Sequence, residues 1–293
     1  MIVVSGTRRA GTSMWMQILV AAGLPVIGEA FPGNWEQSLR QANPHGFHES
    51  LLRHGVYYRT NPHPITGEYV RASDARGHAV KVFLPGLVRT DAAYLDRVIV
   101  TVRPWREYEA SLHRLHVLDE RNMRSDRRRA RAARLRMPPA LEWWDDHITF
   151  LRDLSVRGYA CHVQSYDGVL EDPRGVITRT LAWLDVDADV EAAVAAVQPQ
   201  ARTQRAPESD AVAPHVAEVF DAFYEAVHRG DGLDSALIAR LNRIHQELEP
   251  EIRRQRAQIA AARATPAPEE VEEADAEGHP DDGPFVVLPG EWI

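Results

Sequence analysis

The sequence of 293 residues contains a single cysteine, Cys161, and a single lysine, Lys81. One cysteine excludes an internal disulfide framework and is typical of a protein in a reducing compartment. No apolar run approaches the roughly 18 residues that a membrane-spanning helix requires. The first residues, MIVVSG, lack the charged and apolar regions of a signal peptide, so we expect a cytoplasmic protein with no membrane partner.

An excess of positive charge, which nucleic-acid binding needs, is also missing. The formal net charge is -8, with 44% hydrophobic and 26% charged residues, an ordinary globular composition. Without a basic face to neutralise phosphates, we expect no nucleic-acid partner. The one arginine-rich run, residues 121–136, has acidic neighbours and predicts a solvated helix, with a lid over a cofactor as the alternative.

Short β-branched strands alternate with helical segments along the chain. Strands are expected at 1–6, 78–86 and 159–166, and the stretch 94–104 contains a further strand, RVIVTV, that ends at Arg103. Helices are expected at 12–23, 105–120, 140–158 and 173–186. This alternation predicts an α/β fold with a central parallel sheet and right-handed crossovers.

The chain is expected to form one domain over residues 1–262, whose C-terminal helical extension begins at about residue 214. Residues 263–293 form an acidic, proline-rich tail with little apolar mass. Such a segment cannot offset the entropy lost on ordering, so we expect it to be disordered.

The stretch VVSGTRRAGTSMW, residues 3–15, has the frame of a phosphate-binding loop, G-x-x-x-x-G-K-[ST]. Gly6 and Gly11 bound the loop, but Thr12 stands where the lysine would be. Backbone N–H groups of such a loop, helped by the dipole of the following helix, can bind an anion. The positive charge lies inside this loop, at Arg8 and Arg9.

A second candidate element follows the predicted strand RVIVTV. Arg103 stands at its carboxyl end, where parallel sheets bind ligands, and Ser111 lies eight residues on, in the next helix. A guanidinium and a hydroxyl suit a phosphate monoester. A magnesium-dependent NTPase would carry a Walker-B aspartate near the end of such a strand. Here the strand ends in Arg103, so that class fits poorly.

Four segments together resemble the sulfotransferase family, in particular its bacterial members. SGTRRAGTSMWMQIL is similar to the family's 5′-phosphosulfate loop, and VIVTVRPWREYEASL to its 3′-phosphate motif. GFHES (46–50) resembles the NPKGYxE segment, and YDGVLEDPRGVITRTLAWLDV (166–186) a later conserved segment. The resemblance covers about residues 1–205. It implies a P-loop-like three-layer fold and 3′-phosphoadenosine 5′-phosphosulfate as donor, with no metal expected.

The resemblance also assigns residues. Arg9 takes the position of the catalytic Lys or Arg, and Lys81 is expected near the sulfate. The residues implied at the donor are Arg8, Arg9, Ala10, Gly11, Thr12, Ser13, Arg103 and Ser111. Arg8 replaces the usual proline and Ala10 the usual serine, and Arg8 either adds charge to the loop or faces solvent.

Two parts of the family pattern are missing. Phe83 stands where cytosolic members have the histidine that acts as general base, so Glu49 is the first candidate base and His48 the second. The basic run that completes the 3′-phosphate site in animal members has no match, and Arg202 and Arg205 are the substitutes considered.

The sequence therefore predicts an enzyme that transfers a sulfuryl group to a hydroxyl or amine of a small-molecule acceptor. The alternatives are a magnesium-dependent P-loop kinase and a nucleotide-binding scaffold without catalysis. The sequence identifies neither the acceptor nor an oligomeric state.

Overall fold

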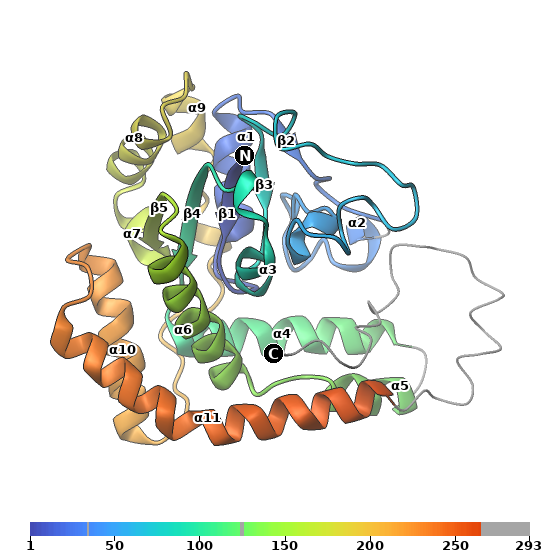
Figure 1. Cartoon of the computed structure of the whole chain (residues 1–293), viewed down its shortest axis with the longest axis vertical. Coiled ribbons are helices and arrows are strands. Elements are labelled where there is room, and N and C mark those ends of the chain that lie inside the picture. The colour runs from blue at the N-terminus through green and yellow to red at the C-terminus, as the bar shows by residue number, and fades with distance from the viewer. Residues whose placement is uncertain (34, 124–125, 265–293) are drawn as a thin grey trace.

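The computed structural model describes residues 1–33, 35–123 and 126–264 (Figure 1). Five parallel strands form one sheet in the order β2-β3-β1-β4-β5. They are β1 (Ile2–Ser5), β2 (Val26–Ile27), β3 (Ala79–Lys81), β4 (Arg97–Val102) and β5 (Cys161–Ser165). The expected α/β class with a parallel sheet is therefore confirmed.

Helices connect and cover these strands over the described residues. They are α1 (Thr12–Ala21), α2 (Trp35–Ser38), α3 (Leu84–Arg89), α4 (Trp105–Asn122), α5 (Asp126–Arg134), α6 (Pro139–Arg157), α7 (Tyr166–Glu171), α8 (Pro173–Leu184), α9 (Val190–Ala195), α10 (Pro214–Arg229) and α11 (Ser235–Ala264). Three 3-10 turns add η1 (Leu51–His54), η2 (Ala92–Tyr94) and η3 (Pro199–Ala201).

The sheet is buried on both faces, which makes the molecule three layers thick. Alternate residues of β1 show this: Ile2 and Val4 pack on one side, against Trp15 of α1 and against α8, and Val3 packs on the other. The second side is covered by α3, α6, α10 and α11, with Trp143 of α6 at its centre. In Figure 1, α1 and α6 accordingly lie on opposite sides of the sheet. Burial on both faces explains the unbroken β-branched runs of the strands.

One strand end and one short helix differ most from the sequence-based expectation. The strand expected over 78–86 ends at Lys81, because Leu84 and Pro85 form the first turn of α3. Proline is well suited to a first turn, where its missing N–H leaves no hydrogen bond unmade. Helix α7 was not expected; Ser165 begins it by accepting a hydrogen bond from the Gly168 N–H.

Helix α11 ends at Ala264, and the acidic tail expected to be disordered lies outside the described residues apart from its first two positions. None of the helices in the described ranges combines the length and the apolar composition that a membrane crossing requires.

Candidate functional site

The strand order has its switch point between β1 and β4, and the carboxyl edge of the sheet at this point carries the candidate site. β1 and β4 are neighbours, but the chain leaves β1 toward β2 on one side and leaves β4 toward β5 on the other. Ligands of open parallel sheets bind where the connections diverge in this way. The loop of residues 6–11 follows β1 at this point, and Arg103 follows β4.

Close packing explains both glycines of this loop. A Cβ on Gly6 would lie 2.7 Å from the carbonyl oxygen of Thr101 in β4. Gly11 has φ +101°, and a Cβ there would lie 2.7 Å from Cδ2 of Tyr166. The Thr101 hydroxyl donates to the Ala10 carbonyl at 3.0 Å, which fixes the loop on β4. The loop therefore enters α1 with its backbone held tightly against two strand ends.

Arg9 lies at this switch point in an unusual backbone conformation, with φ +68°. Its Nε donates to the hydroxyl of Ser111 at 3.1 Å, and its Nη2 donates to the carbonyl of Ala42 at 3.1 Å. Among the described residues, no carboxylate lies within ion-pair distance of Arg9. Burial first, and then the nearby Arg103, lower the pKa of Arg9 to about 10. Arg9 is thus a half-buried cation with no carboxylate within ion-pair distance in the described part of the chain.

Arg103 meets Arg9 from the end of β4. Its Nη1 donates to the Arg9 carbonyl at 3.1 Å, while Nε and Nη2 donate to one oxygen of Glu107 at 3.2 and 3.1 Å. Both Arg103 and Ser111 are buried, at 5% and 4% exposure. Arg103 and Ser111, the residues expected at a 3′-phosphate, therefore both contact Arg9, the residue expected at the 5′-phosphate.

Lys81 lies at the end of β3 and links the loop to the segment 46–50. Its ammonium donates to the hydroxyl of Ser13 at 3.0 Å, to the carbonyl of Phe47 at 3.0 Å and to Glu49 at 2.5 Å. An ammonium has three N–H groups, so all of them are used here. Burial lowers the pKa of Lys81, although the Glu49 carboxylate opposes that shift. The ring of Phe83, 5.3 Å from the ammonium, completes its surroundings.

The segment 46–50 is itself held by backbone bonds. The N–H and carbonyl of Glu49 exchange hydrogen bonds with those of Glu29, at 3.0 and 2.9 Å. His48 adopts φ +51° beside this bridge and is half-buried. Burial, and then the charge of Lys81, lower the pKa of His48. Both candidate bases therefore lie near the loop, on the Lys81 side of it.

Three other residues named from the sequence point elsewhere. Arg8 is directed away from Arg9 and pairs with Glu142 of α6 at 2.8 Å, with 45% of its side chain exposed. Ala10 is fully buried and offers its carbonyl to Thr101. Arg205 is exposed to solvent.

Two residues of this site, Glu107 and Tyr166, were not singled out as site residues from the sequence. Glu107 is a buried carboxylate that accepts from Arg103 and from Arg202. The ring of Tyr166 lies under both guanidinium groups, 4.7 Å from Cζ of Arg103 and 5.9 Å from Cζ of Arg202. The i,i+4 spacing of Arg103 and Glu107 was a readable signal for the first pair.

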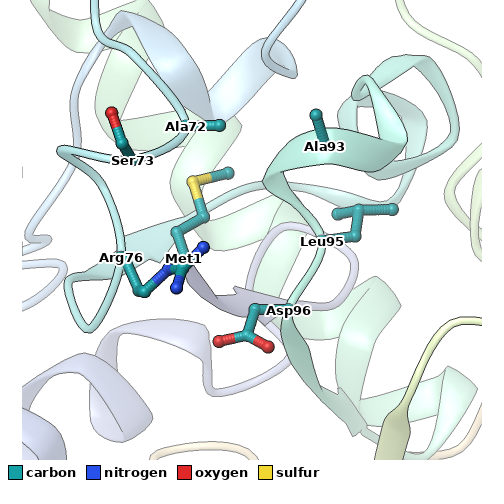
Figure 2. Close-up of a pocket in the computed structure, with 7 residues that line it drawn as sticks. All are labelled: Met1, Ala72, Ser73, Arg76, Ala93, Leu95 and Asp96. Atoms are coloured by element: carbon teal, nitrogen blue, oxygen red, sulfur yellow. The ribbon is translucent and has the colours of Figure 1, made fainter.

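A hollow of about 430 Å³ lies elsewhere, where β1 and β4 begin (Figure 2). It is lined by Met1, Ala72, Ser73, Arg76, Ala93, Leu95 and Asp96. Because it lies at the amino edge of the sheet, it is separate from the loop and Arg103, which lie at the carboxyl edge.

Comparison with protein-family models, with curated proteins and with solved structures gives no significant match for this chain. The functional assignment therefore depends on the site itself.

Proposed function

We propose that this chain is a sulfotransferase that uses 3′-phosphoadenosine 5′-phosphosulfate and transfers its sulfuryl group to a hydroxyl or amine acceptor. The observation that carries the proposal is Arg9, a half-buried guanidinium beside Ser111 and Arg103 that has no carboxylate partner among the described residues. A buried charge is costly unless it is paired, and a bound anion would supply the missing partner.

The fold supports the same reading, as a P-loop-like arrangement. A strand, a glycine-bounded loop and a helix follow one another at the divergence point of a parallel sheet. The N–H groups at the start of α1 are the donors that would hold a 5′-phosphate. The Ser13 hydroxyl lies in the same turn, where it accepts from Lys81 and donates to the Phe47 carbonyl at 3.4 Å. Gly11 carries no side chain that would close this approach, and the packing of Tyr166 leaves no room for one.

The donor and acceptor exchange one bond at sulfur. The bond from sulfur to the bridging 5′-phosphate oxygen breaks, a bond to the acceptor oxygen or nitrogen forms, and the acceptor loses a proton. Arg9 stabilises the negative charge that grows on the bridging oxygen, as fixed cations do in related transfers. The Ser111 oxygen accepts from Arg9, which leaves its O–H to donate to a ligand.

A base must take the proton of the acceptor. Glu49 is engaged by Lys81 at 2.5 Å and approached by Arg53 at 3.6 Å, so its carboxylate is already occupied by cations. His48 is neutral near pH 7, because burial and Lys81 lower its pKa, and a neutral imidazole can accept a proton. We therefore assign the proton to His48, with Glu49 as the alternative.

Calorimetric titration with 3′,5′-bisphosphoadenosine, the spent donor, tests the assignment. We expect a dissociation constant on the order of micromolar, unchanged by Mg²⁺, and a large loss of affinity in Arg103→Ala. The same protein is titrated with ATP in the presence of Mg²⁺, and its affinity for ATP is compared with its affinity for the bisphosphate. Binding of ATP that depends on Mg²⁺, without binding of the bisphosphate, would replace the proposal by a P-loop kinase.

A second measurement separates an enzyme from a scaffold. Incubation with the sulfated donor and a panel of hydroxyl and amine acceptors is expected to release the bisphosphate. Tight binding without any release across a broad panel would favour a nucleotide-binding protein that lacks catalysis.

A further inference from the structure

Glu107 is a buried carboxylate that holds two arginines from distant parts of the chain. It lies in the first turn of α4, and 3% of its side chain is exposed. Arg103 comes from the end of β4, and Arg202 follows the turn η3. One carboxylate therefore joins the end of the sheet to the segment around residue 202.

The hydrogen bonds of Arg103 engage some of its N–H groups and leave others without a partner among the described residues. Glu107 receives Nε and Nη2, the side edge of the guanidinium, and the Arg9 carbonyl receives Nη1. Three of its five N–H groups are therefore engaged within the described residues, and one N–H on each of Nη1 and Nη2 remains. An end-on fork is the geometry that binds a phosphate monoester through two parallel bonds.

Arg202 is held in the same manner. Its Nη2 donates to Oε1 of Glu107 and its Nε lies 3.3 Å from Oε2, so the side edge again faces the carboxylate. Its Nη1 lies 2.8 Å from Oδ1 of Asp167. The ring of Tyr166 lies beneath both arginines and also contacts the loop at Gly11. The loop, the ring and the two arginines thus form one packed assembly.

Stability does not account well for this arrangement. Replacing a buried ion cluster by apolar residues is often neutral or stabilising, because removing charges from water is expensive. What a buried carboxylate does supply is a fixed direction for each guanidinium plane. Glu107 and Asp167 balance the charges of Arg103 and Arg202. Unlike Arg9, these two arginines therefore bring no unbalanced charge to a ligand, and what the cluster provides is the orientation of their N–H groups.

We propose that Glu107 is a positioning residue, which holds Arg103 and Arg202 by their side edges and so presents their remaining N–H groups to a phosphate monoester. The inference rests on the proposed function, in which that group is the second phosphate of the nucleotide. Glu107 does not itself touch the ligand.

The experiment compares two ligands that differ by this phosphate. The affinities of 3′,5′-bisphosphoadenosine and of adenosine 5′-monophosphate are measured by calorimetry on the same preparation, and their ratio is taken. A fraction of unfolded protein reduces the signal of both ligands, so the ratio is insensitive to a loss of stability. The variants are Glu107→Gln, which keeps the shape, and Glu107→Asp, which keeps the charge but shortens the reach.

We expect both variants to lower the ratio by about tenfold or more, comparable to the loss of one charge-assisted hydrogen bond. Glu109→Gln, a half-buried position on the same helix, is the matched control and is expected to leave the ratio unchanged. Glu107 could act through the positions in which it holds the arginines or through its negative charge. Glu107→Asp separates these two explanations, because it preserves the charge and alters only the geometry.

Each outcome has a definite meaning. A wild-type protein that binds neither ligand overturns the proposed function and this inference with it. A wild type that prefers the bisphosphate, with an unchanged ratio in both variants, overturns the inference and leaves the function standing. A ratio that rises in Glu107→Gln would show a carboxylate that competes with the phosphate, which also overturns the positioning role.

Discussion

The ammonium of Lys81 lies 2.5 Å from a carboxylate oxygen of Glu49, and at most 5% of either side chain is exposed. The pair joins β3 to the segment 46–50, and Lys81 also donates to Ser13 in the first turn of α1. The only lysine of the chain therefore positions a hydroxyl of the loop through contacts that use all of its N–H groups.

We expect Glu49→Gln to lower the free energy of unfolding by about 3–5 kcal/mol, because it leaves a buried ammonium without its counter-charge. Urea unfolding of the variant, of Lys81→Met and of the double variant completes a mutant cycle. The double variant is expected to be more stable than Glu49→Gln alone. Additivity within about 0.5 kcal/mol would contradict a coupled pair.

The packing of Gly11 against Tyr166 gives a second prediction. Gly11→Ala introduces a Cβ 2.7 Å from the ring and retains a left-handed backbone, so we expect a loss of about 2–4 kcal/mol. Gly23→Ala, at the other end of α1, has φ +91° and nothing within 4 Å. This control shares the backbone strain without the collision and is expected to lose about 1 kcal/mol. Equal losses measured by thermal unfolding would show that the ring moves aside freely.

Much of the fold was predictable, because its signals are local. The strand 97–102 and the helix after it follow from a β-branched run ended by Arg103 and Pro104, and the structure confirms them as β4 and the start of α4. The error at 78–86 came from reading Val82 and Phe83 as a continued strand. Their apolar character fits a strand or a buried turn equally well, and only the following proline favours the turn.

The site residues also divide into those that a local sequence signal indicates and those that only a tertiary contact brings together. Arg9 was named from its place in the loop and the family resemblance, and Arg103 and Ser111 from a strand end and their spacing; the structure brings all three together. The contacts of Glu107 and Arg202 join positions 95 residues apart, which no local pattern encodes. The choice between Arg202 and Arg205 also depended on this tertiary contact: Arg202 reaches the cluster and Arg205 is exposed.

Neighbouring arginines of the loop should behave differently. Arg9→Ala removes the cation without a counter-charge, so we expect the affinity for 3′,5′-bisphosphoadenosine to fall by about tenfold or more. Arg8→Ala breaks a half-exposed pair with Glu142 and is expected to change that affinity by less than about threefold, since such pairs contribute little. Calorimetry on both variants provides the comparison. The opposite order would place the charge of Arg8, and not that of Arg9, in the anion site.

The last prediction concerns acid stability and is independent of the function. His147 in α6 is 1% exposed, and its Nδ1 donates to the Trp143 carbonyl at 2.6 Å. Its Nε2 has no hydrogen-bond partner among the described residues. A proton on Nε2 would bury an unpaired charge, so burial lowers the pKa of His147 from 6.5 to about 4.

Between these two pKa values the unfolded chain binds a proton that the folded chain does not. The stability contributed by neutral His147 is therefore complete above pH 6.5 and is lost progressively as the pH falls toward 4, by about 3 kcal/mol over the window.

His147→Phe keeps an aromatic ring between Trp143 and Phe223 and removes the titration. Urea unfolding at both ends of the window should show a smaller loss of stability in this variant than in the wild type. His215→Gln, at an exposed position, is the control and should leave the difference unchanged. Parallel losses in His147→Phe and the wild type would mean that His147 is protonated in the folded protein, which requires a hydrogen-bond acceptor or water at Nε2.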